Sequence, residues 1–190
     1  MSTPIQVHTE RLILRQWRTD DRAPLAALNA DPQVMACFPA LLTRAQSDAM
    51  AECCEALIAE RGWGFWALER RDTGEFIGFT GLHEPADTLS CAPCVEIGWR
   101  LASAHWGQGL AFEAAQAALT VGFERLGLDE IVAFTATGNT RSLSLMQRLG
   151  MRPAGEFDHP ALAEDSPLRR HRLFRLARTA FTPPIPGALG

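Results

Sequence analysis

Hydrophobic and polar positions alternate along several segments of the chain, and this alternation predicts β-strands. The clearest case is residues 95–102, where every odd position from Val95 to Leu101 is apolar. Alternation or short apolar runs predict the other strands, which lie over residues 11–17, 63–70, 75–83, 130–136, 152–157 and 169–177. Residues 71–74, Arg-Asp-Thr-Gly, are typical of a hairpin turn between two of these strands.

Apolar residues three to four positions apart predict two helices in the first third of the chain. A short helix over residues 20–31 is capped by one of the two aspartates at its start and ends at an Asp-Pro pair. A longer helix begins after Thr43, which forms a capping box with Gln46, and it runs to about residue 60.

Two further helices are predicted in the second half. One begins at Gly107 or Gly109 and ends at Leu126, and small residues on its apolar face allow close packing on a sheet: Ala111, Ala115, Ala118, Leu119, Gly122, Phe123 and Leu126. The other is capped by Asn139 and closed by Gly150.

This order of elements predicts one α+β domain over residues 9–178, without an internal repeat or linker. Residues 1–8 are expected to form a loose N-terminal arm. Residues 179–190, which are rich in proline, are expected to form a flexible C-terminal tail.

Composition excludes several kinds of chemistry. All 18 basic residues are arginine, and the chain has no tyrosine, so lysine Schiff bases, a Walker-A lysine and tyrosine acids or bases are impossible. The formal charge of −4 argues against nucleic acid as a partner. The basic cluster over residues 169–172 is too short to change that conclusion.

The five cysteines do not predict a disulfide framework, because their number is odd. Cys91-x-x-Cys94 has the spacing of half a zinc site or of a redox pair, but no second pair accompanies it, so no metal is expected. Free thiols suit a reducing compartment. With no secretory signal or long apolar run, we expect a cytoplasmic protein that does not contact membranes.

A glycine loop, Gly107-Gln108-Gly109, joins a strand to a helix. Such loops let backbone N–H groups converge on an anion at the positive end of a helix, so a pyrophosphate can bind without lysine. The dinucleotide-binding fingerprint would need a third glycine at position 112, where the chain has Phe112. A nicotinamide enzyme is therefore disfavoured.

A second motif follows: the chain pairs WGQGLAFEAA with N-x-x-S-x-x-L-M-x-R-L-G-M after the next strand, and it opens with TERLILRQW and TGEFIGFTGL. This combination resembles the GNAT family of acyl-CoA N-acetyltransferases, in its RimJ/RimL-like branch, over residues 9–178. The resemblance implies the GNAT fold, an α+β fold with a mixed, mostly antiparallel twisted sheet of six to seven strands and about four helices.

The resemblance also implies acetyl-CoA as cosubstrate and an amine as acceptor. The family's pyrophosphate loop falls on Trp106, Gly107, Gln108, Gly109, Leu110 and Ala111. Gly109 and Ala111 match its pattern, whereas Trp106 replaces a glutamine or arginine. The pantetheine arm would lie beside Leu101 and Ala102, and Asn139 and Ser142 would lie near the thioester.

Two residues are candidates for proton transfer in this reaction. Glu96 lies on the strand before the glycine loop, where many family members place a general base; a surface glutamate or an ion-paired one is the alternative. Ser142 is the best hydroxyl to assist the departing thiolate, because the tyrosine that many relatives use is absent. His159 could bind the acceptor or relay a proton, or simply occupy a turn. Asn139 could act only as a helix cap, and Glu113 is expected to make a structural contact.

The sequence thus predicts an N-acetyltransferase in which an amine, such as a protein N-terminal α-amine, attacks the thioester directly. Two alternatives stay open: a small-molecule amine acceptor, such as a polyamine, an amino acid or a drug, and a non-catalytic acyl-CoA sensor. The protein would be a monomer or a homodimer.

Overall fold

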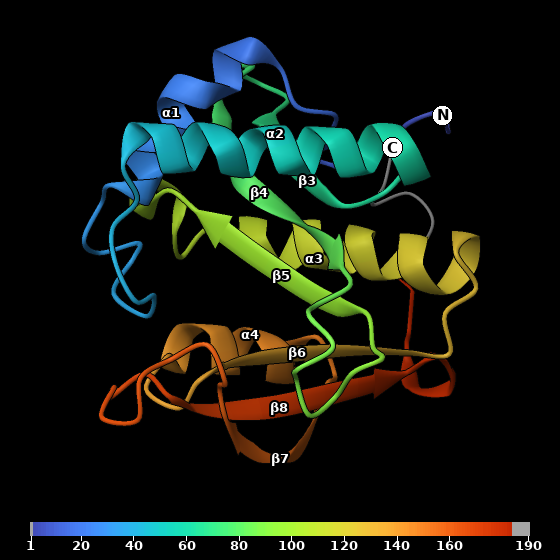
Figure 1. The fold of residues 1–190 in the computed structure, drawn as a ribbon. Helices are drawn as coiled ribbons and strands as arrows, with labels where there is room; N and C mark the ends of the chain where they lie inside the picture. Colours follow the sequence, from blue (N-terminus) through green and yellow to red (C-terminus); the bar gives the residue numbers. More distant parts are fainter. Residues whose placement is uncertain (1, 184–190) are drawn as a thin grey trace.

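The computed structural model describes residues 2–183, which form one eight-stranded sheet with helices on both faces (Figure 1). The strands are β1 (Val7–His8), β2 (Leu12–Arg15), β3 (Phe65–Arg70), β4 (Phe76–His83), β5 (Glu96–Leu101), β6 (Glu130–Ala136), β7 (Arg152–Asp158) and β8 (Arg170–Ala177). The α-helices are α1 (Arg22–Asn29), α2 (Arg44–Arg61), α3 (Leu110–Thr120) and α4 (Thr140–Arg148). A π-helical turn, Val121–Arg125, extends α3.

The predicted strands and helices all form, within a few residues of their expected ends. The difference is at the N-terminus, where residues 1–8 were expected to be loose. Val7 and His8 instead form β1, which pairs antiparallel with β2, so the sheet has one strand more than predicted. At the other end, the Phe181 ring packs 5.0 Å from that of Phe123. Residues 184–190 of the expected tail lie outside the described part.

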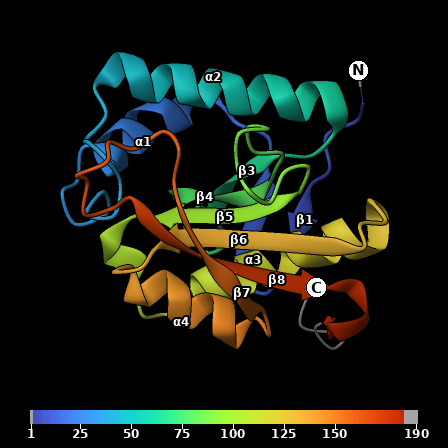
Figure 2. The same cartoon turned by 60° about the horizontal axis from the view of Figure 1, so that its bottom comes forward.

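The sheet has the strand order β1-β2-β3-β4-β5-β6-β8-β7. All neighbours pair antiparallel except β5 and β6, which are parallel. Helices α1 and α2 lie over one face, and α3 and α4 lie over the other (Figure 2). Within the described residues, no helix is long and apolar enough to cross a membrane.

The period of two along β5 sorts its side chains between these faces. Ile97 and Leu101 belong to the main core with the buried alanines of α3. Glu96, Gly98 and Arg100 therefore face the side of α1 and α2. The small residues predicted for the α3 face allow that helix to lie close against the sheet.

The parallel strands β5 and β6 touch at one end only. In the described chain their register consists of a single pair, Glu96 with Val132. Beyond that pair the strands diverge toward their C-terminal ends, so the sheet splits into two halves (Figure 1). Beyond the pair of Glu96 with Val132, the edge of β5 that faces β6 and the edge of β6 that faces β5 are therefore unpaired, while β5 stays paired with β4 and β6 with β8.

A buried ion pair fixes the first half of the sheet to α1. The Arg15 guanidinium makes a two-fold contact with Asp21, at 2.7 and 2.8 Å, and its Nε donates to Glu69 at 2.6 Å. Only 4% of the Arg15 side chain and 3% of the Asp21 side chain are exposed. Each charge therefore depends on its partner, because an unpaired charge in the interior is costly.

Asp21→Asn is expected to lower the free energy of unfolding by roughly 3 kcal/mol, because it leaves the buried Arg15 with one carboxylate fewer. Urea unfolding of the variant and the parent measures the difference. The control is Asp48→Asn, which breaks the surface pair of Asp48 with Arg44 and should cost at most about 0.5 kcal/mol. Equal losses in the two variants would contradict the role of Asp21.

Candidate functional site

The gap between β5 and β6 exposes backbone groups of β5. The Ala102 N–H donates to the Ile77 carbonyl oxygen at 2.9 Å, so the even-numbered residues of β5 bond to β4. The odd-numbered residues direct their backbone groups to the other side. There the Val95 carbonyl accepts from the Val132 N–H at 2.9 Å, close to where the pairing of β5 with β6 stops.

Further along β5, this alternation points the backbone groups of Trp99 and Leu101 into the gap. The Leu101 carbonyl oxygen accepts a hydrogen bond from Trp106 Nε1 at 2.9 Å. The β5 edge next to Leu101 and Ala102 is thus a strand edge inside the molecule, of the kind that can pair with an extended amide-containing ligand.

The predicted glycine loop closes one end of this gap. Gly107 and Gly109 have φ values of 73° and 79°, a left-handed conformation that favours glycine. Gly109 is the N-cap of α3 and has no side chain to accept from the first helical turn, whereas α2 and α4 are capped by Thr43 and Asn139. The first N–H groups of α3, which begins at Leu110, are therefore available to an anion.

The loop is held from a distant part of the chain. The Arg11 Nη1 donates to the Gln108 carbonyl oxygen at 2.8 Å, and its Nε donates to Glu113 at 2.7 Å. Glu113 also accepts from the Thr9 hydroxyl at 2.5 Å. Burial alone would raise the pKa of Glu113, but these hydrogen bonds outweigh it and lower the pKa. Glu113 thus makes the structural contact expected of it.

Helix α4 forms the opposite wall of the gap. The Asn139 Oδ1 accepts from the Ser142 N–H at 3.3 Å, and its Nδ2 donates to the Thr135 hydroxyl at 2.8 Å. Asn139 is therefore a helix cap with both ends of its amide engaged. The Ser142 Oγ accepts from Trp99 Nε1 at 3.3 Å, which joins α4 to β5 across the gap.

A second contact joins the glycine loop to α4. The Arg141 guanidinium lies over the Trp106 ring, with its Cζ 4.1 Å from the ring centroid. Trp106 thus makes a hydrogen bond to the Leu101 carbonyl through its indole N–H and a cation–π contact with Arg141 through its ring face. Most of the candidate site, from Leu101 to Ala111 and from Asn139 to Ser142, is brought together around one opening.

Glu96 lies where the gap begins, on the face of α1 and α2. It is opposite His83 on β4 and opposite Val132 on β6. The residue is partly exposed, while its carboxyl group is surrounded by protein, and this burial raises its pKa to about 8. Of the two alternatives, the ion-paired glutamate is not what the structure shows, since no described cation forms a salt bridge with Glu96.

Glu96 and Ser142 therefore lie on opposite faces of the sheet, on either side of β5. Ser142 contacts Trp99, which points to the α3 and α4 side, whereas Glu96 points to the α1 and α2 side. A reaction that used both would take place in the gap between β5 and β6. Its two reactants would enter from opposite faces of the sheet.

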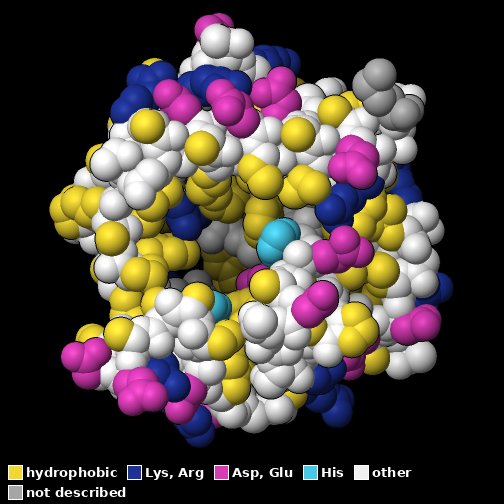
Figure 3. All heavy atoms as spheres, in the orientation of Figure 1, with side chains coloured by type: hydrophobic (Ala, Val, Ile, Leu, Met, Phe, Trp, Pro, Cys, Tyr) yellow, Lys and Arg dark blue, Asp and Glu magenta, His cyan; other side chains and the backbone are white. Residues whose placement is uncertain are grey.

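The face of α1 and α2 is hollowed beside β5. Figure 3 shows this hollow below α2, with mainly apolar walls and with arginine, histidine and acidic atoms at its margin. Phe65 of β3 stacks on His83 with ring centroids 5.4 Å apart, and its ring lies next to Gly98. The neighbouring Trp66 is fully buried on the opposite side of β3 and belongs to the core.

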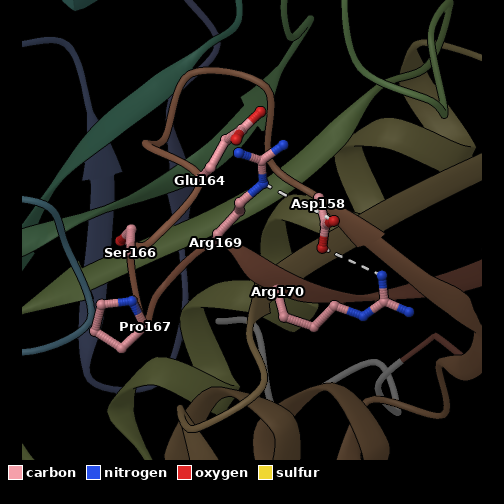
Figure 4. Close-up of a pocket in the computed structure, with 6 residues that line it drawn as sticks. All are labelled: Asp158, Glu164, Ser166, Pro167, Arg169 and Arg170. Carbon is pink, nitrogen blue, oxygen red and sulfur yellow. Dashed lines mark hydrogen bonds and ion pairs between the residues drawn. The ribbon is translucent and has the colours of Figure 1, made fainter.

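A further surface pocket, about 400 Å³ in volume, lies on the connection of β7 with β8 (Figure 4). It is lined by Asp158, Glu164, Ser166, Pro167, Arg169 and Arg170. Asp158 lies 3.2 Å from Arg170 and 3.9 Å from Arg169, so these charges neutralise one another. The pocket lies outside the gap between β5 and β6.

His159 lies next to this pocket in a small aromatic cluster. Its ring is 5.0 Å from that of His171, and burial together with the charge of His171 lowers its pKa. Its Nδ1 accepts from the Ala161 N–H at 3.3 Å, while Asp158 pairs with arginines instead. No described contact brings His159 to Glu96 or Ser142.

Cys91 and Cys94 lie on the connection of β4 with β5, with their sulfur atoms 2.9 Å apart as free thiols. Burial, followed by the contact with Cys91, raises the pKa of Cys94 to about 12. Across residues 2–183 no group of three or more His, Cys, Asp or Glu side chains could hold a metal ion.

Sequence reasoning missed the two side chains that close the site, Trp99 and Arg141. Trp99 stands in the regular apolar alternation that predicts a strand over residues 95–102, and this pattern alone does not separate a site residue from a core residue. A signal was present, because the N–H group of a buried indole usually finds a hydrogen-bond acceptor. Arg141 follows Asn139 in the second motif, but no pattern indicates that it stacks on Trp106.

Comparisons with known proteins agree with this geometry. The family described as acetyltransferase (GNAT) domain matches residues 11–152. The uncharacterized N-acetyltransferase YoaA of Bacillus subtilis (strain 168) is 32% identical over 151 residues, which are 78% of this chain and 84% of that protein.

Solved structures share the fold. An acetyltransferase of the GNAT family from Bacillus anthracis has a TM-score of 0.78 at 22% identity, over 92% of this chain and 99% of that one. Mycobacterium smegmatis RimJ in complex with CoA-disulfide has a TM-score of 0.75 at 20% identity, over 98% of this chain and 91% of that one.

The raised pKa of Glu96 predicts a pH-dependent cost to stability. The pKa rises from about 4.3 in the unfolded chain to about 8 in the folded protein. The stability contributed by the neutral carboxyl is therefore complete below pH 4 or so and is lost as the pH rises through about 8. Glu96→Gln stays neutral, so its stability relative to the parent should grow over this range, by on the order of a few kcal/mol.

Urea unfolding at a series of pH values measures the difference between Glu96→Gln and the parent. The matched control is Glu60→Gln at the exposed end of α2, which should show no such trend. A difference that is constant from pH 4.5 to pH 9 would contradict the raised pKa.

Proposed function

The chain belongs to the GNAT family of acetyltransferases, and we propose that it transfers an acetyl group from acetyl-CoA to a primary amine by direct attack of the amine on the thioester. The observation that carries this proposal is the divergence of β5 from β6 beside an N-terminal turn of α3 that has no side-chain cap. A strand edge and a phosphate-binding helix start are thereby combined in one opening.

The donor would bind along the gap. The N–H groups that follow Gly109 suit a pyrophosphate, and the β5 edge beside Leu101 and Ala102 suits the amides of the pantetheine arm. Arg141, stacked on Trp106 at the same opening, adds a positive charge next to this path. The absence of lysine is no obstacle, because backbone groups supply the contacts.

Glu96 is proposed as the general base. An amine must lose a proton to attack, and an N-terminal α-amine has a pKa of about 7.7–8.0. The pKa of Glu96, about 8, is close to that of this amine, so the ionised carboxylate can accept the proton without a large energetic cost. The hollow lies on the face of the sheet to which Glu96 points, and the acceptor would approach from that face (Figure 3).

Ser142 is proposed to assist the thiolate that leaves. Its oxygen accepts from the Trp99 indole, so the hydroxyl proton is directed elsewhere and can be donated. A thiol with a pKa of about 8.5 needs only modest help to leave, so one hydrogen bond suffices. This arrangement supplies what the missing tyrosine provides in many relatives.

Acetyl-CoA is expected to raise the melting temperature of the parent protein. In Gly109→Ala the apparent affinity for acetyl-CoA, measured from this rise, should be at least about tenfold lower, because a left-handed φ is costly for alanine and the loop must change its conformation. Gly127→Ala is a matched control. Gly127 has φ 71°, and a Cβ there or at Gly109 would lie 3.5 Å from an arginine Nη2. The control should bind acetyl-CoA normally.

The same preparations decide between enzyme and sensor. A panel of amines and N-terminal peptides is incubated with acetyl-CoA, and mass spectrometry reads the acetylated products. Protection without any product would favour the acyl-CoA sensor, and the absence of both would refute acetyl-CoA as the donor.

Ser142→Ala is expected to lower kcat roughly 10- to 100-fold with little change in acetyl-CoA affinity, because its hydrogen bond acts on the leaving thiolate. Ser144→Ala, at an exposed position of the same helix, should leave kcat unchanged. Steady-state rates from product mass measure both variants. An unaltered kcat in Ser142→Ala would remove Ser142 from the mechanism.

A further inference from the structure

Arg15 of β2 and Arg100 of β5 both point to the side of α1 and α2. Only one of these two arginines has carboxylates as partners. Arg15 is neutralised by Asp21 and Glu69. Arg100, near the end of β5, has no described carboxylate as a partner, and burial lowers its pKa to about 10. An enclosed cation without a counter-charge is unfavourable unless something supplies one.

The contacts described for Arg100 are made by its Nη1, which reaches Asn29 and Met50, and by the face of its guanidinium, and none is made by the Nε–Nη2 edge. Its Nη1 donates to the Asn29 Oδ1 at 2.6 Å, and its Cζ lies 3.9 Å from the centroid of the Phe38 ring. Among residues 2–183, no hydrogen-bond partner is found for the buried Nε. The Nε and Nη2 groups form the side-on edge that binds a carboxylate through two parallel hydrogen bonds.

Asn29 and Phe38 hold this group in one orientation. Asn29 is fully buried and donates its own Nδ2 to the Ser47 hydroxyl at 2.9 Å. Phe38, on the connection of α1 with α2, and Phe79, on β4, both present ring faces to the guanidinium. The cation is therefore pre-organised by neutral neighbours, which is typical of a binding group and not of a structural ion pair.

Arg100 lies on the same face of β5 as Glu96. The two residues alternate with Gly98 on the side of α1 and α2, and their Cα atoms are roughly 13 Å apart along the strand. This is the side of the sheet on which the hollow of Figure 3 lies, because Arg100 contacts Asn29 of α1. An acceptor amine at Glu96 would thus place its distal part toward Arg100.

We propose that the acceptor carries a carboxylate several bonds away from its amine, and that Arg100 binds this carboxylate through Nε and Nη2. The inference rests on the proposed function, because it assigns the substrate class of the same acceptor site. From the open acceptor classes it selects peptides and those amino acids whose reacting amine lies several bonds from the carboxylate. It excludes polyamines, which the acidic net charge would otherwise favour.

The experiment compares acceptors that differ only in the carboxylate. γ-Aminobutyrate is paired with butylamine, and alanyl-alanine is paired with its C-terminal amide. The carboxylate of a small molecule and the carboxylate of a peptide are thereby tested separately. Thermal protection in the presence of CoA measures binding, and product mass measures kcat and KM. In each pair that binds, the carboxylate form should bind about 10- to 100-fold more tightly.

Arg100→Gln should abolish this preference, so that the KM values of γ-aminobutyrate and butylamine differ by less than about twofold in the variant, while acetyl-CoA still protects it from thermal unfolding. Arg100→Lys should restore part of the preference, because a point charge replaces the two-fold contact. Arg152→Gln, an exposed arginine on the strand at the far edge of the sheet, should keep the preference unchanged. If Arg100→Gln does not fold, the comparison within each pair in the parent protein decides.

The outcomes separate the two proposals. Acetylation of both members of each pair with equal KM, or binding of no carboxylate, overturns the role of Arg100 and leaves acetyl transfer intact. Preferential binding of the carboxylates without any product keeps the role of Arg100 and contradicts the proposed transfer.

Discussion

The structure depends on the single point at which two parallel strands pair. At Glu96 and Val132 the sheet is continuous, and beyond them β5 stays with β4 while β6 stays with β8. Antiparallel ladders on either side hold the two halves rigidly, so the gap cannot close by local movement. Interior backbone groups must be satisfied, and here a ligand between the halves could satisfy those that Trp106 leaves free.

The same division separates the two tasks of a transferase. One face of β5 carries Trp99, in contact with Ser142, and the other carries Glu96 and Arg100. Donor and acceptor can therefore be recognised by different layers of the molecule. The helix pair α1 and α2 packs on the face of β5 that carries Glu96 and Arg100, and its connecting loop also reaches the segment after β5, where the Ser103 hydroxyl donates to Asp31 at 2.9 Å.

Much of this arrangement could be predicted from local patterns. Alternation over 95–102, the glycines at 107 and 109, and the capping residues Thr43 and Asn139 act within a few positions, and each element formed where expected. What escaped prediction depends on residues far apart. The indole of Trp99 meets Ser142, 43 positions away, and Arg100 meets Asn29, 71 positions away. No spacing rule connects such positions, because tertiary packing brings them together.

The hydrogen bonds of Arg11 to Gln108 and Glu113 have a consequence for protein engineering. The residues that they join are about a hundred positions apart, so the glycine loop is not a portable module. A chimera that received only residues 101–111 would acquire the turn without the guanidinium that holds it. A transplant of this loop into another scaffold therefore has to include Glu113 and the connection of β1 with β2, which carries Thr9 and Arg11.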